Sequence, residues 1–340
     1  MRPVLAGSVS NFFDSAGQFF SSLASINWGW LALGLLCFLT YLSIRSRAYF
    51  HVLRAAYPTE RFRFRDIWGA YIAAYGFNNV IPARGGDLIR IFLTKSSVPN
   101  SSYPAVGSSF MVEAVFDVTM GAVILSFAFT QGVFPKPPDF SKLDAFDLSY
   151  FASHPRFTLF VLTAFMVVLV VAFALLSTRV QAFWARVRQG ITILWDRKRY
   201  FREVWLVQFC GWLFRFAAFW FLLEAFGVGG SVRNVLLVLG VNAVAAAVPF
   251  TPGGAGVQQA LLVKVFAGTA AGATVAAYSV GQQIAIGAFT LGVGFVLLVA
   301  VFNIRSFKEV IRRGKEDRAA DKAARAAGVT ADPGGPRAPA

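Results

Sequence analysis

The sequence predicts an all-α polytopic membrane protein, and three observations lead to that class. Of the 340 residues, 56% are hydrophobic and only 14% are charged, whereas soluble domains carry about 25% charged residues. Long apolar runs occupy residues 31–41, 158–176 and 289–302, as expected of membrane spans. Two further apolar segments are broken by proline and glycine. We therefore predict about five full spans plus two broken re-entrant helix pairs in an inverted-repeat arrangement.

The elements follow in order along three regions. Residues 1–27 form an N-terminal segment with an expected interfacial helix, residues 28–305 the transmembrane domain, and residues 306–340 a basic, largely disordered tail. A basic amphipathic helix is expected over residues 180–200 at the inner surface. The full spans are expected at 28–44, 103–131, 157–177, 203–226 and 273–303.

The net charge of +15 is concentrated in three clusters, at 45–65, 179–202 and 305–315, which we expect in loops and in the tail. Because basic loops stay in the cytoplasm, the clusters predict a bacterial inner-membrane protein with a cytoplasmic C-terminus. The charge then reflects topology and attraction to anionic lipid headgroups, and no nucleic-acid partner is expected.

The first break follows a short apolar run over residues 67–77. Its roughly 12 helical residues reach only about 18 Å, well short of a hydrocarbon core of about 30 Å. Irregular backbone cannot face lipid, so the break must be buried in protein or line a wet cavity. The breaking residues are Pro82, Gly85 and Gly86.

The second break separates apolar segments at 233–247 and 254–266. On the predicted topology this pair enters from the outside, whereas the first enters from the inside. Interrupted segments at corresponding positions of two halves indicate a transport site. The breaking residues are Pro249, Pro252 and Gly256, with Gly253 and Gly254 between them.

Arg84, Asp87 and Arg90 lie three residues apart, directly after the first break. Charged groups at membrane depth normally face a cavity or one another. We expect the arginines to bind a phosphate, with Asp87 orienting them and Asn78 and Asn79 beside them. The alternative is a cluster at the inner rim near the headgroups, with Arg90 reaching the interface.

Glu113 and Asp117 are four residues apart and so share one helical face within a span. Two carboxylates in an apolar helix require a cation, a proton or an arginine, and Arg84 and Arg215 are the expected partners. Arg215 itself lies mid-span, and we expect it to bind phosphate together with Arg84 and Arg90. A charge relay and a structural ion pair both remain open.

At the second break, Gly253 and Gly254 free backbone amides at a helix start, which attracts anionic groups. Gln259 adds neutral hydrogen-bonding capacity. Close helix packing at the glycines is the alternative.

Enzyme signatures are sparse. The two histidines, His51 and His154, fall on opposite predicted sides of the membrane, and Cys37 and Cys210 lie in apolar runs. No metal site, cofactor or catalytic activity is expected.

Four stretches carry a family resemblance: residues 79–90, residues 109–117, Arg215 and residues 248–257. Over residues 28–305 the chain resembles the lysylphosphatidylglycerol synthase transmembrane region, a flippase-like integral membrane family. The resemblance implies two re-entrant pairs and lipid translocation, best attributed in members that flip an aminoacylated phosphatidylglycerol. Asp87 and Gln259 stand where the family usually has glutamate. About 35 residues follow residue 305, so no synthase domain is expected there.

The sequence therefore predicts a lipid flippase that moves a phospholipid or phosphate-linked lipid between the two re-entrant pairs. Its expected partners are membrane lipids with anionic or phosphate-bearing headgroups. One alternative is an integral-membrane transferase that uses Glu113 or Asp117 as a base on a lipid-linked substrate. The other is a non-catalytic membrane partner of a glycosyltransferase or lipid synthase.

Overall fold

The computed structural model describes residues 25–79, 81, 85–131, 183–245 and 257–304, together with 312, 314 and 316. All regular elements in this part of the chain are helical. Four helices are long and apolar enough to cross a membrane, which confirms an all-α polytopic membrane fold. They cover Trp28–Ala56, Tyr103–Ala128, Arg197–Ala225 and Gly272–Phe302.

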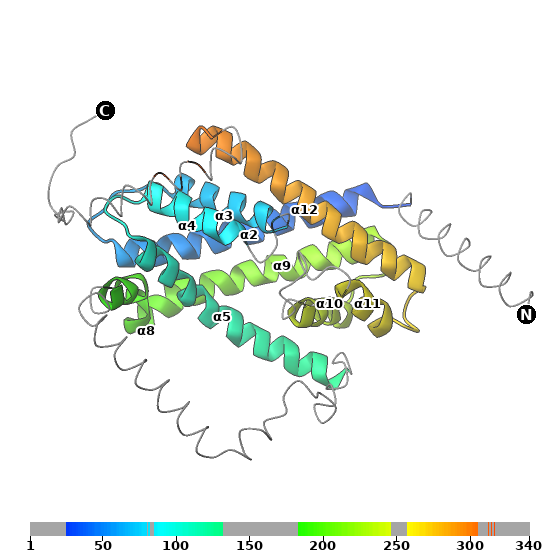
Figure 1. Ribbon diagram of the computed structural model, residues 1–340. Helices are drawn as coiled ribbons and strands as arrows, with labels where there is room; N and C mark the ends of the chain where they lie inside the picture. The colour runs from blue at the N-terminus through cyan, green and yellow to red at the C-terminus, as the bar shows by residue number, and fades with distance from the viewer. Residues whose placement is uncertain are drawn as a thin grey trace, which may run out of the picture.

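Helix α9 (Leu206–Ala225) packs along α2 (Trp28–Ala56), and α5 (Tyr103–Thr130) packs on α2 and on the two pairs of short helices (Figure 1). The contact between α2 and α9 uses glycine: a Cβ on Gly34 would lie 3.1 Å from Leu222 and 3.2 Å from the Ala218 carbonyl. Small residues of this kind let helix backbones approach closely where no water drives association. The first helix begins at Asn27, whose side chain accepts from the backbone N–H groups of Gly29 and Trp30.

Two pairs of short helices lie toward opposite ends of the long ones (Figure 1). The pair α3 (Phe64–Asn78) and α4 (Gly86–Ser97) lies toward the end where α2 finishes. The pair α10 (Val232–Ala245) and α11 (Val257–Val265) lies toward the end where α12 (Gly272–Phe302) begins. The four short helices agree with the sequence-based expectation; that each pair enters the bilayer from a different side stays a prediction.

The first pair is held by backbone-to-backbone contact at glycines. A Cβ on Gly76 would lie 2.6 Å from the Thr290 carbonyl oxygen and 2.8 Å from the Leu291 Cα, so α3 touches α12 without an intervening side chain. A Cβ on Gly86 would collide with the Ala74 carbonyl, which brings α4 equally close to α3. These contacts fix the start of α4 and with it the direction of Arg90.

The predicted first span, 28–44, is too short. Helix α2 continues to Ala56, so Arg45, Arg47 and Arg54 lie on a helix and not in a loop. Each guanidinium has a partner that makes this tolerable: Arg47 lies 5.2 Å from the Phe50 ring, and Arg54 lies 6.0 Å from the Phe62 ring. Arg45 forms an ion pair described below.

The predicted amphipathic helix over 180–200 is not continuous where it is described. Residues 183–190 are helical, a 3-10 turn η4 (Thr192–Trp195) follows, and α8 (Arg197–Tyr200) leads through a π-helical turn η5 (Phe201–Trp205) into α9. The break follows Gly190, which packs directly on the Ala105 carbonyl of α5. Asp196 then caps the new helix by accepting from the Arg199 N–H.

Several expectations fall outside the described residues. They are the interfacial helix within 1–27, the span at 157–177, and the breaks at Pro82, Arg84 and 249–256. In the predicted disordered tail, the described residues Arg312, Gly314 and Glu316 are helical.

Candidate functional site

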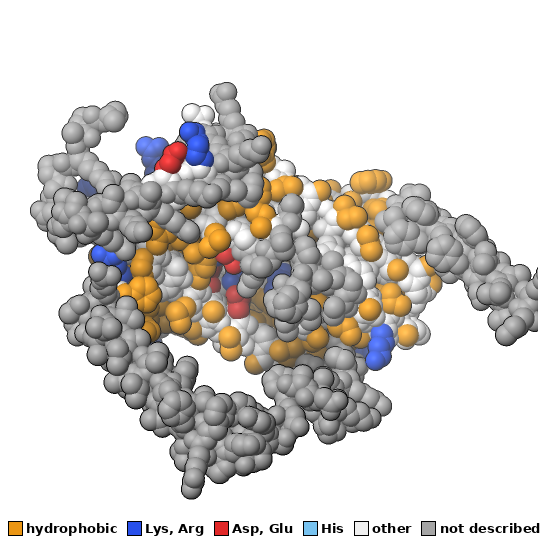
Figure 2. Space-filling view, viewed as in Figure 1, with side chains coloured by type: hydrophobic (Ala, Val, Ile, Leu, Met, Phe, Trp, Pro, Cys, Tyr) orange, Lys and Arg blue, Asp and Glu red, His pale blue; other side chains and the backbone are white. Residues whose placement is uncertain are grey.

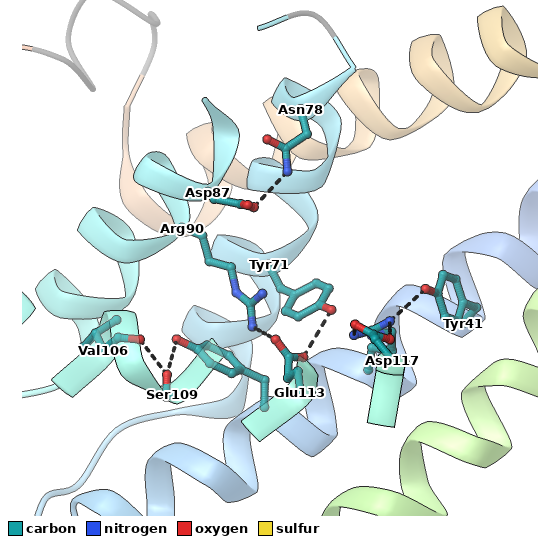
Figure 3. Close-up of polar contacts among 11 residues, drawn as sticks. Tyr41, Tyr71, Asn78, Asp87, Arg90, Val106, Ser109, Glu113 and Asp117 are labelled. Atoms are coloured by element: carbon teal, nitrogen blue, oxygen red, sulfur yellow. Dashed lines mark hydrogen bonds and ion pairs between the residues drawn. The ribbon is translucent and has the colours of Figure 1, made fainter. Parts of the chain in front are cut away.

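Arg90 and Glu113 form a buried ion pair between α4 and α5. The Arg90 Nη2 lies 2.5 Å from a Glu113 carboxylate oxygen, and the two side chains are only 10% and 5% exposed. The Tyr71 hydroxyl donates to the other oxygen of Glu113 at 3.3 Å, so both carboxylate oxygens are bound (Figure 3). This pair therefore joins three helices, α3, α4 and α5, at one carboxylate.

Three aromatic rings enclose the Arg90 guanidinium. Its Cζ lies 3.8 Å from the centroid of Tyr49, 4.1 Å from Tyr71 and 4.2 Å from Phe110. At such distances the ring faces stabilise the cation, more so when water is excluded. The Arg90 Nε has no hydrogen-bond partner among the described residues. The ion pair of Arg90 and Glu113 is thus closed, with little room for a ligand.

Arg45 and Asp117 form a second ion pair, near the middle of α2 and α5. The guanidinium donates through both Nη atoms to the two carboxylate oxygens, each at 2.8 Å, which is the bidentate geometry of a strong pair. Arg45 Nη1 also donates to the Tyr41 hydroxyl at 3.2 Å (Figure 3). Arg45 is 11% exposed, but Asp117 is 49% exposed. This pair is open on the carboxylate side.

Arg215, on α9, lies beside the second pair. Its guanidinium Cζ is 5.7 Å from the Tyr41 ring and 5.9 Å from the Phe219 ring. No carboxylate or hydrogen-bond acceptor among the described residues contacts it. Since Tyr41 also contacts Arg45 at 5.9 Å, one ring lies near both cations. We call Arg45, Asp117 and Arg215 the open cluster.

Figure 2 shows acidic and basic side chains gathered near the middle of a face whose other side chains are mostly hydrophobic. A charge at this depth is costly unless it faces a cavity, a partner or a ligand. Together the two ion pairs and Arg215 hold one more cation than anion. That composition favours an anionic group as the missing partner.

Among the site residues predicted near the first break, Asn78 and Asn79 form hydrogen bonds to different helices. The Asn78 amide donates to the Asp87 carboxylate at 2.9 Å, linking the end of α3 to the start of α4 (Figure 3). Asn79 donates to the Thr290 hydroxyl at 3.2 Å and so ties α3 to α12. Arg90 turns away from this group toward Glu113.

The second pair of short helices carries neutral contacts. The Gln258 amide donates to the Asn242 side-chain oxygen, and Gln259 donates to the Gln283 oxygen, both at 2.8 Å. Gln259 therefore connects α11 to α12. Gly253 and Gly254 lie outside the described residues. In the part of the chain that is described, no three His, Cys, Asp or Glu side chains come together as metal ligands.

The structure changes the expected ion pairing. Asp117 pairs with Arg45 instead of Arg215, and Glu113 pairs with Arg90. The sequence does not single out Arg45, because the basic cluster at 45–65 predicts a loop. A signal was present: Tyr41, Arg45 and Tyr49 continue a spacing of four, which is typical of one helical face.

A known protein family matches most of the chain. The family model described as "Lysylphosphatidylglycerol synthase TM region" matches residues 4–294. No curated protein matches the chain.

Proposed function

Since the chain belongs to the lysylphosphatidylglycerol synthase transmembrane family, we propose that it translocates a phosphate-bearing lipid across the bacterial inner membrane. The family links this multi-pass membrane protein to lipid metabolism or lipid flipping. Transport of lipid, without chemical change, is the activity that we assign to the chain. In this proposal the C-terminus lies in the cytoplasm.

The observation that carries the proposal is Arg215, which has no carboxylate partner among the described residues. It lies near the middle of α9, and its guanidinium is 5.7 Å from the Tyr41 ring and 5.9 Å from the Phe219 ring. Keeping a cation at this depth without a carboxylate is unfavourable, and a transient anionic partner removes the cost. Arginine binds phosphate through its planar fork of N–H donors.

Asp117 supplies the complementary charge. Its half-exposed carboxylate is held in place by Arg45, so it can accept a second cation without losing the first. A lipid headgroup that carries an amine beyond its phosphate fits these two charges, because Arg215 would bind the phosphate and Asp117 the amine. In the proposed mechanism, the headgroup enters the open cluster while the hydrocarbon tails stay in the bilayer.

The closed pair has a different part in the mechanism. Arg90 and Glu113 join α4 to α5, and the Arg90 cage draws rings from α2, α3 and α5. We propose that this pair keeps α3, α4 and α5 in a fixed arrangement, against which the second pair of short helices rocks to give alternating access.

Reconstitution tests this proposal. Purified full-length protein in liposomes should move headgroup-labelled phospholipid between leaflets, read by a reductant that reaches only the outer leaflet. Arg215→Gln should lower the rate about tenfold, since one charge-assisted contact corresponds to about that factor. The matched control is Arg233→Gln, which removes an exposed arginine of α10 that bonds Gln131 and should leave the rate unchanged.

Two outcomes would contradict the proposal. If well-folded wild-type protein moves no lipid, transport by this chain alone is wrong, and a partner enzyme becomes the better account. If Arg215→Gln and Arg233→Gln transport equally well, the open cluster does not bind the headgroup.

A further inference from the structure

Six aromatic side chains follow one another along η5 and α9. They lie three or four residues apart and therefore share one helical face. Consecutive ring centroids are 5.3, 5.5, 6.3, 5.8 and 6.4 Å apart, and the first three pairs are stacked within 16° of parallel. We call these residues the aromatic stripe: Phe201, Trp205, Phe209, Trp212, Phe216 and Trp220.

The stripe does not match the usual placement of aromatic residues in membrane proteins. Tryptophan is enriched at the two interfaces, where its ring lies at headgroup level. Here the rings continue through the middle of the helix. At about 1.5 Å per residue, the stretch from Phe201 to Trp220 is roughly 28 Å long, close to the thickness of a hydrocarbon core. The stripe therefore reaches across both leaflets.

The stripe runs beside the open cluster. Trp212 precedes Arg215 by three residues, a spacing at which helical side chains are neighbours, and Trp205 contacts Phe116, which precedes Asp117 on α5, at 5.6 Å. In the described part of the chain the stripe is partly uncovered: Phe201 is 51% exposed, and the other five rings are partly exposed, three of them (Trp212, Phe216 and Trp220) also packing on the main core. An apolar surface thus lies directly against a charged one.

We propose that the aromatic stripe binds the hydrocarbon chain of the lipid whose headgroup occupies the open cluster, an inference that rests on the proposed function. A lipid chain from one leaflet spans about half of the core. It would therefore contact one half of the stripe, such as Phe201 to Phe209, before translocation and the other half, Trp212 to Trp220, afterwards. The flat ring faces offer many dispersion contacts in either position. The tail therefore keeps its binding surface while the headgroup crosses.

Tail-specific photolabelling tests the inference. Full-length protein is reconstituted with a trace of phospholipid that carries a diazirine at the end of one acyl chain, and labelled peptides are mapped by mass spectrometry. We expect the label on the stripe residues. The double variant Phe209→Leu/Phe216→Leu should lower that labelling about fivefold, because two aromatic contacts are lost while the side chains stay apolar.

The matched control is Phe214→Leu. Phe214 is an exposed ring on the same helix, 37% exposed and outside the stripe, and its removal should change neither labelling nor translocation. Thermal melting of each variant shows whether the fold is retained. The positions of the photolabel in the wild-type protein are measured without any variant. They therefore test the inference even if the double variant does not fold.

The outcomes separate this inference from the proposed function. Labels on the stripe in wild-type protein that moves no lipid would support the stripe and reject the transporter. Translocation with labels spread evenly over Phe214 and the stripe would reject the stripe and leave the transporter. Crosslinks between two copies of the chain at the stripe would mark it as a dimer contact and also overturn the inference.

Discussion

The two ion pairs of α5 lie one helical turn apart and differ in exposure. Arg90 and Glu113 are 10% and 5% exposed, and three aromatic rings enclose the arginine. Arg45 and Asp117 are 11% and 49% exposed, and Arg215, which has no carboxylate partner among the described residues, lies beside them. The same chemistry thus occurs once closed and once open.

The difference shows how a membrane protein can use charge for two purposes. A buried pair fixes helices in one arrangement, because removing either member strands the other in an apolar environment. A pair with an open side keeps its geometry while offering free carboxylate surface to a ligand. We therefore assign the first pair to the fold and the second to the headgroup.

Glu113→Gln should have the largest effect. It leaves the Arg90 cation buried with a neutral partner, and loss of one member of a buried pair costs about 3–5 kcal/mol in the free energy of unfolding. Thermal melting in detergent measures this. The control is Glu60→Gln, whose carboxylate accepts an exposed hydrogen bond from Asn100 and should cost under about 1 kcal/mol.

Arg45→Gln should destabilise the protein less than Arg90→Gln. The carboxylate that it leaves behind, Asp117, is half exposed, so it is less strongly desolvated than Glu113 and we expect a cost of about 1–2 kcal/mol. The same melting experiment compares the two variants. Equal losses of stability in the two variants would show that the open pair and the closed pair contribute alike to the fold.

Asp117→Asn should change headgroup preference as well as stability, because it also leaves Arg45, which is 11% exposed, without its carboxylate. Translocation of lipids with a cationic headgroup should fall about threefold to tenfold, since a charge-assisted contact is lost. Lipids with only a phosphate should move at the wild-type rate. Parallel assays with the two headgroup classes measure the ratio, and an unchanged ratio would remove Asp117 from the site.

Gln259→Ala should have the smallest effect. It removes a neutral hydrogen bond to Gln283 between α11 and α12, which is worth about 1 kcal/mol. We expect a small drop in melting temperature and little change in headgroup preference. A large change in preference would move the recognition site toward the second pair of short helices.

The sequence predicted the elements better than the contacts. Apolar run length and the position of glycine placed α3, α4, α10 and α12 close to their observed bounds, because these signals are local. Arg45 was assigned to a loop, since the positive-inside rule counts basic residues without asking whether the helix continues beneath them.

The site was predicted in part. A spacing of four put Glu113 and Asp117 on one helix face, and their depth required arginine partners. Which arginines those are depends on how α2 and α4 pack on α5, and glycine contacts such as Gly86 on Ala74 set that packing. Contacts between distant segments of this kind leave no periodic pattern in the sequence. The aromatic stripe does have such a pattern.

Exchanging the members of the open pair tests the central claim most directly. In the double variant Arg45→Asp/Asp117→Arg, an ion pair can form with its polarity reversed, so a purely structural pair would recover both stability and transport. We predict that the double variant melts at a higher temperature than either single variant but stays defective in translocation, because the carboxylate no longer faces the headgroup beside Arg215. Wild-type translocation by the double variant would contradict the account.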